Sequence, residues 1–346
     1  MSRQYDSRMQ RLWYADGYYH WLLAPFSALF FVLSALRRAL YRIGVLRSSR
    51  VAVPVIVVGN ISVGGTGKTP VTIWLAKQLR SRGLSPGIAS RGYGGVIGDT
   101  PAQVNANSDA EIVGDEPLLI ARRAGCPVVV HPNRAAAARE LIAMGVDIVI
   151  CDDGLQHYKL QRDFEIAVLG GARGLGNGWV LPAGPLRETG SRLFSVDRVL
   201  VHLAQRSSAP PATVSLPIGK TNGFHLVGHE LLSVDGQETR TFEQFAGKTV
   251  HAVAAIGNPE RFFQSLERRG MNVVRHPFPD HAQFTSMELT FDDDLDIVMT
   301  EKDAVKCGQF ATTRFWYVPV DVDMHDDEWV DAMVEKLLPH AKQEQQ

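Results

Sequence analysis

The chain has 346 residues, with 36 Lys and Arg against 37 Asp and Glu, and a net charge of −1. This balance excludes a strongly basic nucleic-acid-binding protein, so no nucleic acid partner is expected, and 45% hydrophobic residues exclude a disordered chain. At roughly 150 residues per domain, the length indicates about two domains. The three cysteines are widely separated and show no disulfide or zinc-site spacing, which favours a reducing compartment.

The first 50 residues differ from the rest of the chain, because they hold eight arginines against two acidic residues. Within them, residues 21–36 form an uncharged and largely apolar run, with aromatic residues before it and Arg37 and Arg38 after it. As a helix this run is about 24 Å long, against a hydrocarbon core of about 30 Å. We predict that residues 1–50 form a membrane-associated segment that lies on or spans the bilayer. A buried core helix is the alternative.

Residues 51–210 are predicted to form a parallel sheet covered by helices on both faces, because strand and helix patterns alternate along them. Strands are expected at 53–60, 87–90, 127–131, 147–154, 164–170 and 197–203, and helices at 71–83, 115–125 and 133–145. A long loop rich in Gly and Pro follows at 170–190, and SSAPPA at 207–212 is a candidate domain boundary.

Residues 211–346 are predicted to form a second, smaller α/β domain. A hairpin is expected at 229–242, with Asp235-Gly236 at its turn. Strands at 249–257 and 271–278, a helix at 259–269, a segment at 296–306 and a last helix near 327–338 follow. The expected fold is therefore a P-loop NTPase-like sheet domain with a smaller α/β domain and an N-terminal membrane-associated helix.

A glycine-rich loop, SVGGTGKT, joins the first strand and helix of the larger domain. It consists of Ser62, Val63, Gly64, Gly65, Thr66, Gly67, Lys68 and Thr69. Such a loop turns backbone N–H groups toward a polyphosphate at a helix N-terminus. Lys68 supplies charge to the β- and γ-phosphates, and Thr69 can bind Mg²⁺. The loop predicts a nucleotide site, although Ser62 stands where the common pattern has its first glycine.

Two adjacent carboxylates, Asp152 and Asp153, end the hydrophobic strand at 147–154. The carboxyl end of a strand beside the P-loop strand is where a second metal-binding acid is expected. Side chains alternate along a strand, so the two point to opposite sides and either can contact the metal. A simple Asp-Gly turn is the alternative.

Asp115, Glu116 and His281 have plain structural explanations when spacing alone is considered. The two acids precede Pro117, and acids and proline both favour a helix N-terminus. His281 lies in the loop FPDH, where a lone histidine is usually a surface residue.

Three arginines, Arg91, Arg134 and Arg187, lie at strand ends or in the Gly/Pro-rich loop. Arginines at such places suit phosphate or sugar oxygens, and they are candidate substrate-binding residues. Solvated side chains would give the same spacing.

Seven motifs resemble, in the same order, those of the tetraacyldisaccharide 4'-kinases of lipid A biosynthesis, over about residues 10–310. They are VGNISVGGTGKTP (58–70), SRGYGG (90–95), VGDEPLL (113–119), DDGLQH (152–157), LPAGPLRE (181–188), FPDH (278–281) and TEKDAVK (300–306). The kinase loop followed by RGYGG and DDGLQH is specific to that family.

The resemblance implies transfer of the γ-phosphoryl group of ATP to the 4'-hydroxyl of an acylated glucosamine disaccharide 1-phosphate, which yields lipid IVA at the cytoplasmic face of the bacterial inner membrane. By the same resemblance Asp115 is the catalytic base, paired with His281. Lys68 is the third catalytic candidate, on the evidence of the loop itself. Glu116, Asp152 and Asp153 belong to the Mg²⁺ and nucleotide side. The segment 1–50 would bring the site to its lipid substrate at the membrane surface.

Two other functions fit parts of the sequence. A membrane-recruited P-loop ATPase that positions partner proteins would use the same loop and anchor, without an Asp–His pair or a second α/β domain. A soluble small-molecule kinase would leave the apolar run at 21–36 explained only as core. Dependence of ATP consumption on an acylated sugar separates the first of these from the lipid kinase.

Overall fold

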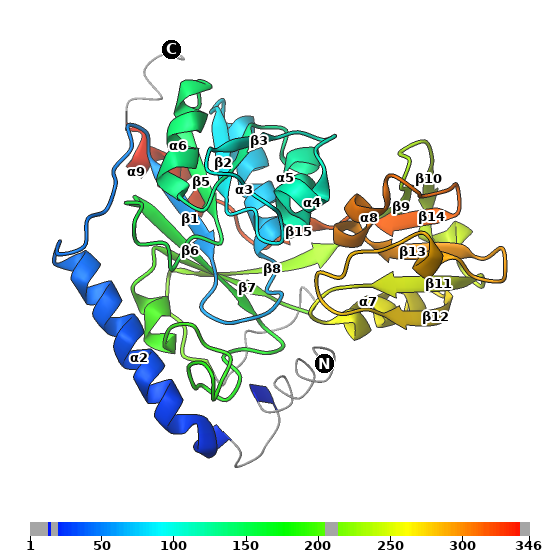
Figure 1. Cartoon of the computed structure of the whole chain (residues 1–346), viewed down its shortest axis with the longest axis horizontal. Helices are drawn as coiled ribbons and strands as arrows, with labels where there is room; N and C mark the ends of the chain where they lie inside the picture. The colour runs from blue at the N-terminus through cyan, green and yellow to red at the C-terminus, as the bar shows by residue number, and fades with distance from the viewer. Residues whose placement is uncertain (1–12, 15–19, 205–213, 340–346) are drawn as a thin grey trace.

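The computed structural model describes residues 13–14, 20–204 and 214–339, which form two α/β units and a long outer helix. A nine-stranded sheet builds the larger unit and a six-stranded sheet the smaller one. Figure 1 shows the two units side by side, with helix α2 (His20–Arg42) along the outside of the larger unit, on the side away from the smaller one.

The larger sheet is mainly parallel, with the strand order β15-β8-β7-β6-β1-β5-β2-β4-β3. Only the two edge strands, β15 and β3, run antiparallel to their neighbours in this sheet. The strands are β1 (Val55–Gly59), β2 (Pro86–Ser90), β3 (Ala102–Val104), β4 (Val128–Val130), β5 (Ile148–Asp152), β6 (Phe164–Gly170), β7 (Arg198–His202), β8 (Thr221–Val227) and β15 (Asp321–Met324).

Helices cover both faces of the larger sheet, which confirms the predicted architecture. Helices α3 (Lys68–Ser81), α4 (Ala110–Val113), α5 (Asp115–Ala124) and α9 (Trp329–Leu337) pack on one face, and α6 (Arg134–Ala143) and the 3-10 helix η1 (Gly190–Phe194) on the other. Alternate residues of β1 enter opposite cores, Ile56 and Val58 on the first face and Val55 and Val57 on the second. Continuous apolar strands of this kind need cover on both faces.

The smaller unit has the strand order β10-β9-β14-β13-β11-β12. Its strands are β9 (Glu230–Ser233), β10 (Thr239–Thr241), β11 (Thr249–Ala254), β12 (Asn272–Pro277), β13 (Asp296–Thr300) and β14 (Phe315–Val318). Helix α7 (Pro259–Glu267) packs on one face and α8 (Glu301–Cys307) on the other. Two 3-10 turns, η2 (Phe242–Gln244) and η3 (Met287–Leu289), complete it.

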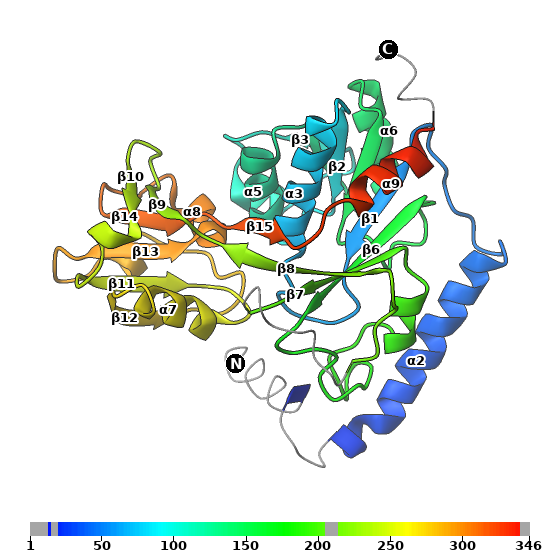
Figure 2. The same ribbon diagram turned by 180° about the vertical axis from the view of Figure 1, so that it is seen from behind.

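The chain divides differently from the predicted boundary at residue 211. Strands β8 and β15 belong to the larger sheet and connect the two units, as Figure 2 also shows. Helix α9 returns to the larger unit, where Trp329 packs against Trp74 with ring centroids 5.9 Å apart. Burial of the apolar face of α9 against α3 stabilises the return of the C-terminal segment to the larger unit. The candidate boundary at 207–212 lies outside the described residues.

Helix α2 is long and apolar enough to cross a membrane, by length and composition alone. Only 6% of its most apolar window is buried against the protein, which contradicts a core helix. Ser27 is its buried contact: the hydroxyl donates to Val180 O and accepts from Ala183 N, both at 2.9 Å. Large apolar side chains remain exposed on α2, among them Trp21, Leu22, Phe26, Leu29, Phe31, Val32, Leu33 and Leu36.

Candidate active site

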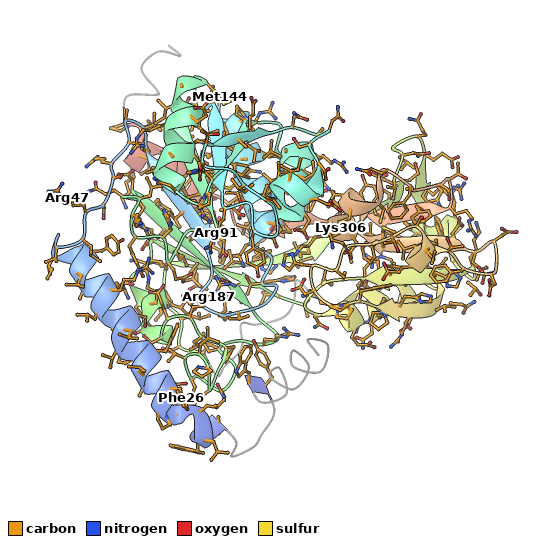
Figure 3. The ribbon with its side chains drawn as sticks, viewed as in Figure 1. Phe26, Arg47, Arg91, Met144, Arg187 and Lys306 are labelled. Carbon is orange, nitrogen blue, oxygen red and sulfur yellow. The ribbon has the colours of Figure 1, made fainter. Side chains whose placement is uncertain are left out.

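A cavity of about 1500 Å³ lies between the two units, over the end of β1. All eight residues from Ser62 to Thr69 line it, together with His281 and Lys302 of the smaller unit. Figure 3 labels Arg91 and Arg187 on the larger unit's side of this region and Lys306 on the smaller unit's side. The motifs singled out in the sequence therefore meet at the carboxyl ends of the parallel strands, where α/β proteins bind ligands.

The glycine-rich loop has the backbone that phosphate binding requires. Gly64 and Gly67 have φ values of 110° and 93°, which residues with a Cβ rarely adopt. The loop leads directly into α3, which begins at Lys68. Buried Asn60 supports the loop from below, because its Nδ2 lies 3.4 Å from both Gly64 O and Thr66 Oγ1. Free backbone N–H groups at this helix N-terminus suit an anion.

Asp152 and Asp153 point to different surroundings, as strand alternation predicted. Asp152 is buried and accepts hydrogen bonds from Thr72 Oγ1 at 3.0 Å and Ser90 Oγ at 3.4 Å. Burial, together with the neighbouring Glu116 and Asp153, raises the pKa of Asp152 to about 7. A buried carboxyl group among other carboxylates would release its proton to water when a cation binds beside it.

Asp153 joins the P-loop lysine to the Gly/Pro-rich loop. Its carboxylate lies 3.8 Å from Lys68 Nζ and 3.3 Å from Arg187 Nη1. Despite burial, these two cations lower the pKa of Asp153. Its backbone φ of 46° is left-handed, so the chain turns sharply there. Arg187, predicted to bind substrate, therefore has a carboxylate partner at the edge of the cavity.

Asp115 and His281 come from different units and meet. His281 Nδ1 lies 3.2 Å from Asp115 Oδ2, and the carboxylate is 4% exposed. Although burial opposes it, the hydrogen bond from His281 and the charge of Lys302 lower the pKa of Asp115 to about 2. The same hydrogen bond raises the pKa of His281. The two residues that spacing alone explained as a helix terminus and a loop histidine thus form an acid–imidazole pair.

Two lysines of α8, which sequence reasoning did not single out, complete this cluster. Lys302 Nζ lies 3.0 Å from Glu116 Oε1, 3.8 Å from Asp115 Oδ2 and 3.3 Å from His281 Nε2. Lys306 Nζ lies 3.8 Å from Asp115 Oδ2 and is 1% exposed. Burial opposes charge on Lys302, but the acids Glu116 and Asp115 raise its pKa overall. In the sequence, Lys302 and Lys306 were marked only by the motif TEKDAVK, which contains both.

The other two candidate substrate arginines lie at the cavity in different states. Arg91 is exposed on its wall. Arg134 is 3% exposed, its Nη2 lies 3.5 Å from Asp152 O, and its buried Nε has no hydrogen-bond partner. An unsatisfied buried donor beside a cavity indicates a place for an acceptor.

Oxygen donors suitable for a hard cation surround the P-loop. Thr69, Glu116, Asp152 and Asp153 all line the cavity. Among the described residues no three His, Cys, Asp or Glu side chains already have metal-binding geometry. The raised pKa of Asp152 is the observation that fits a divalent cation, because a cation there would relieve repulsion among the acids.

Comparisons with known proteins identify the family of this chain. The family described as "Tetraacyldisaccharide-1-P 4'-kinase" matches residues 19–339. A tetraacyldisaccharide 4'-kinase of Aromatoleum aromaticum is 50% identical over 302 residues, 86% of this chain and 88% of the relative. Another, of Pseudomonas aeruginosa, is 45% identical over 338 residues, which covers 96% and 99% of the two chains.

The solved structures include one with the same fold. LpxK from Aquifex aeolicus, in complex with ATP, is 28% identical with a TM-score of 0.77, and the match covers 92% of this chain and 100% of that one. These likenesses do not favour a partner-positioning ATPase. With a family match over nearly its whole length, the chain belongs to the tetraacyldisaccharide 4'-kinase family, whose members are kinases of lipid A biosynthesis.

Proposed function

We propose that this kinase transfers the γ-phosphoryl group of ATP to the 4'-hydroxyl of an acylated glucosamine disaccharide 1-phosphate, with Mg²⁺. The observation that carries the proposal is the Asp115–His281 pair, contributed by two units, whose histidine lines the same cavity as the P-loop. A sugar hydroxyl is a poor nucleophile, so a positioned proton acceptor opposite a phosphate loop suits its phosphorylation.

His281 is the better proton acceptor of the pair. Asp115 has a pKa of about 2, its Oδ1 accepts from Glu116 N, and its Oδ2 is bound to His281. Because Nδ1–H donates to the carboxylate, the lone pair of the ring is on Nε2, and His281 lines the cavity. We therefore assign proton acceptance to His281 and orientation of the ring to Asp115, in place of the base role that the resemblance gave Asp115.

In the proposed reaction, the 4'-oxygen forms a bond to the γ-phosphorus as the bond to the bridging oxygen of ADP breaks. The hydroxyl proton passes to His281 Nε2, and ADP leaves with the electron pair of the broken bond. Lys68 and the P-loop N–H groups, which line the cavity at the start of α3, are proposed to stabilise charge on the phosphates. Arg134, with its unsatisfied Nε, and Arg91 are proposed to bind acceptor or phosphate oxygens.

Thr69, Asp152, Asp153 and Glu116 are the proposed ligands and neighbours of Mg²⁺. When bound, the ion neutralises charge on the transferred phosphoryl group. Asp152 is held by Thr72 and Ser90, so its carboxylate already has a fixed direction. Glu116 would have to exchange its contact with Lys302 to serve as a ligand.

Helix α2 is proposed to hold the enzyme at the cytoplasmic face of the inner membrane. Its exposed apolar side chains form a surface that water does not favour, and the arginines that follow suit anionic lipid headgroups. Phe30, Leu33 and Arg37 of this helix also line the cavity. An acceptor whose acyl chains stay in the bilayer would therefore meet α2 and the phosphate site together.

The proposal is tested by following labelled γ-phosphate from ATP in mixed micelles that contain the disaccharide 1-phosphate. Transfer of label to the 4'-position, with none to an acceptor that lacks the 4'-hydroxyl, is expected. ATP hydrolysis that is independent of the acylated sugar would contradict it. Omission of Mg²⁺ in the presence of a chelator should abolish transfer, and readdition should restore it.

A further inference from the structure

We infer that Glu188 is a positioning residue of this kinase, which links the outer helix α2 to the P-loop. Glu188 lies on the Gly/Pro-rich loop, next to Arg187, and its side chain is only 10% exposed. Its Oε1 accepts from Gln156 Nε2 at 2.9 Å, and its Oε2 accepts from Tyr158 OH at 2.7 Å. Buried carboxylates that are held from several sides keep one orientation.

On one side, this carboxylate leads to the phosphate-binding loop. Gln156 Nε2 also donates to Asn60 O at 3.0 Å, and Asn60 Nδ2 lies 3.4 Å from Gly64 O. A series of hydrogen bonds therefore runs from Glu188 through Gln156 and Asn60 to Gly64 of the P-loop.

The backbone next to Glu188 makes a second connection to the P-loop strand. Arg187 N donates to Ile61 O at 2.7 Å, and Val63 N donates to Pro185 O at 2.8 Å. The side chain of Arg187 then reaches Asp153, which in turn lies beside Lys68. A shift of the loop around residue 188 would move the start of the P-loop and the partner of Lys68 together.

On the other side, Glu188 reaches α2. Arg38 Nη1 lies 3.7 Å from Glu188 Oε2, and Arg38 Nη2 donates to Ser195 Oγ at 3.1 Å. Near the other end of the helix, Ser27 binds the backbone of Val180 and Ala183. The helix therefore holds the loop 180–188 at two points, about three turns apart.

A surface ion pair of this length contributes little to stability, since Arg38 is 34% exposed. Its position matters more than its strength. Arg38 connects helix α2, with its broad exposed apolar surface, to the Glu188 carboxylate, which is hydrogen-bonded to Gln156. Gln156, Tyr158 and Arg192 already orient the Glu188 carboxylate. Contact of α2 with lipid, which is part of the proposed function, would fix Arg38 and with it the distance between the helix and the loop that carries Glu188. The geometry thus makes turnover depend on α2 beyond mere attachment to the membrane.

The test compares Arg38→Met and Glu188→Gln with Arg42→Met, which removes the same charge from the same helix one turn further on. For each variant, kcat and both KM values are measured in mixed micelles, with vesicle binding and thermal stability alongside. We expect kcat to fall roughly 2- to 30-fold in Arg38→Met and Glu188→Gln, the range of measured couplings along such networks. Vesicle binding of Arg38→Met and Arg42→Met should be equal.

The double variant Arg38→Met/Glu188→Gln should lose no more kcat than the worse single variant. Multiplicative losses, or an Arg38→Met enzyme with the kinetics of Arg42→Met, would overturn the inference. If Glu188→Gln does not fold, Arg38→Met still decides, because its side chain is at the surface. Failure of the wild-type enzyme to phosphorylate the acceptor would count against the proposed function instead.

Discussion

Lys302 Nζ lies 3.3 Å from His281 Nε2, on the ring nitrogen that points away from Asp115. This is the nitrogen to which the acceptor hydroxyl would donate its proton. The Lys302 ammonium group therefore occupies the position that the acceptor hydroxyl would take. Binding of the acceptor must move Lys302 aside, while the Asp115 carboxylate, 3.8 Å from Lys302 Nζ, keeps it near the site. A cation released there is close to where negative charge develops during phosphoryl transfer.

Replacement of Lys302 by Met is expected to lower kcat/KM by about 100-fold, the scale of losing one charged group that stabilises a transition state. Lys302→Arg should retain more activity because it keeps the charge. Steady-state kinetics with ATP and the acceptor measure both effects, and Lys77→Met, at an exposed ion pair with Asp321, is the control. Full activity of Lys302→Met would show that the contact with His281 has no role in turnover.

The acidic limb of the pH–rate profile should move in Asp115→Asn. His281 must be neutral to accept a proton, and its hydrogen bond to Asp115 raises its pKa, so activity rises with pH through that raised value. Without the carboxylate the pKa of His281 falls, and the limb shifts to lower pH. The maximal rate of Asp115→Asn should fall as well. In His281→Ala, which lacks the proton acceptor, the maximal rate should fall by up to about 10²–10⁴-fold.

NMR titration of the His281 ring in the wild type and in Asp115→Asn measures that pKa directly. A pKa that is the same in both proteins, or a limb that stays in place, would contradict the assignment of His281 as the base. Asp109→Asn, which changes a helix cap outside this pair, is a suitable control for general effects of losing a carboxylate.

Lys68→Ala should reduce turnover roughly 100-fold or more while the protein stays folded. Lys68 begins α3 and lies 3.8 Å from Asp153, so its loss removes the cation of the P-loop and leaves Arg187 as the ion-pair partner of that carboxylate. Kinetics and thermal unfolding are measured together. Near-wild-type turnover would refute the P-loop assignment.

Aspartate substitutions on the exposed face of α2 should release the enzyme from membranes. Leu22 and Leu29 are 75% and 58% exposed, so Leu22→Asp and Leu29→Asp leave the protein core intact. A charge in the hydrocarbon region costs about 2.5–3.5 kcal/mol on insertion scales. Flotation with anionic vesicles should show much weaker binding of the double variant, with unchanged ATP affinity. Unchanged flotation would mean that this face does not enter lipid.

His202 should make the fold sensitive to acid. It is buried behind the P-loop, stacked on Phe224 and 2.9 Å from Arg261 Nη2, and burial and that charge lower its pKa to about 3. In the unfolded chain this histidine has a pKa near 6.5, so it takes up a proton at a higher pH than in the folded protein. The free energy of unfolding therefore falls as the pH drops from about 6.5 toward 3. Denaturant unfolding at several pH values should show a smaller fall in His202→Phe, and an equal fall would contradict this.

Most strands of both sheets could be predicted, because buried parallel strands are short apolar runs between turn signals. β6 was predicted with its observed ends, and β1, β5 and β11 to within a few residues. β8 and β15 were not predicted, because each is half-exposed and pairs with a strand far away in the sequence. Pairing between distant segments leaves no local pattern, so the domain boundary was wrong.

The site residues show the same contrast between local patterns, which the sequence reveals, and contacts between distant segments, which it does not. The P-loop is a local sequence with a local function, and spacing alone identified it. The Asp115–His281 pair joins residues 166 positions apart, and only the family resemblance suggested it. Lys302 and Glu188 were not predicted as functional, since their roles depend on neighbours supplied by other elements.

The two connecting strands also mean that residues 228–320 are an insertion in the larger unit. Val227, at the end of β8, is the direct partner of Asp321, at the start of β15, so the chain leaves and re-enters this sheet at points about 5 Å apart. A short turn in place of the insertion would close the sheet without moving either strand. The protein left behind would keep its nucleotide loop but lack His281 and Lys302. In this architecture the proposed proton acceptor lies on an inserted unit, separate from the loop proposed to bind phosphate.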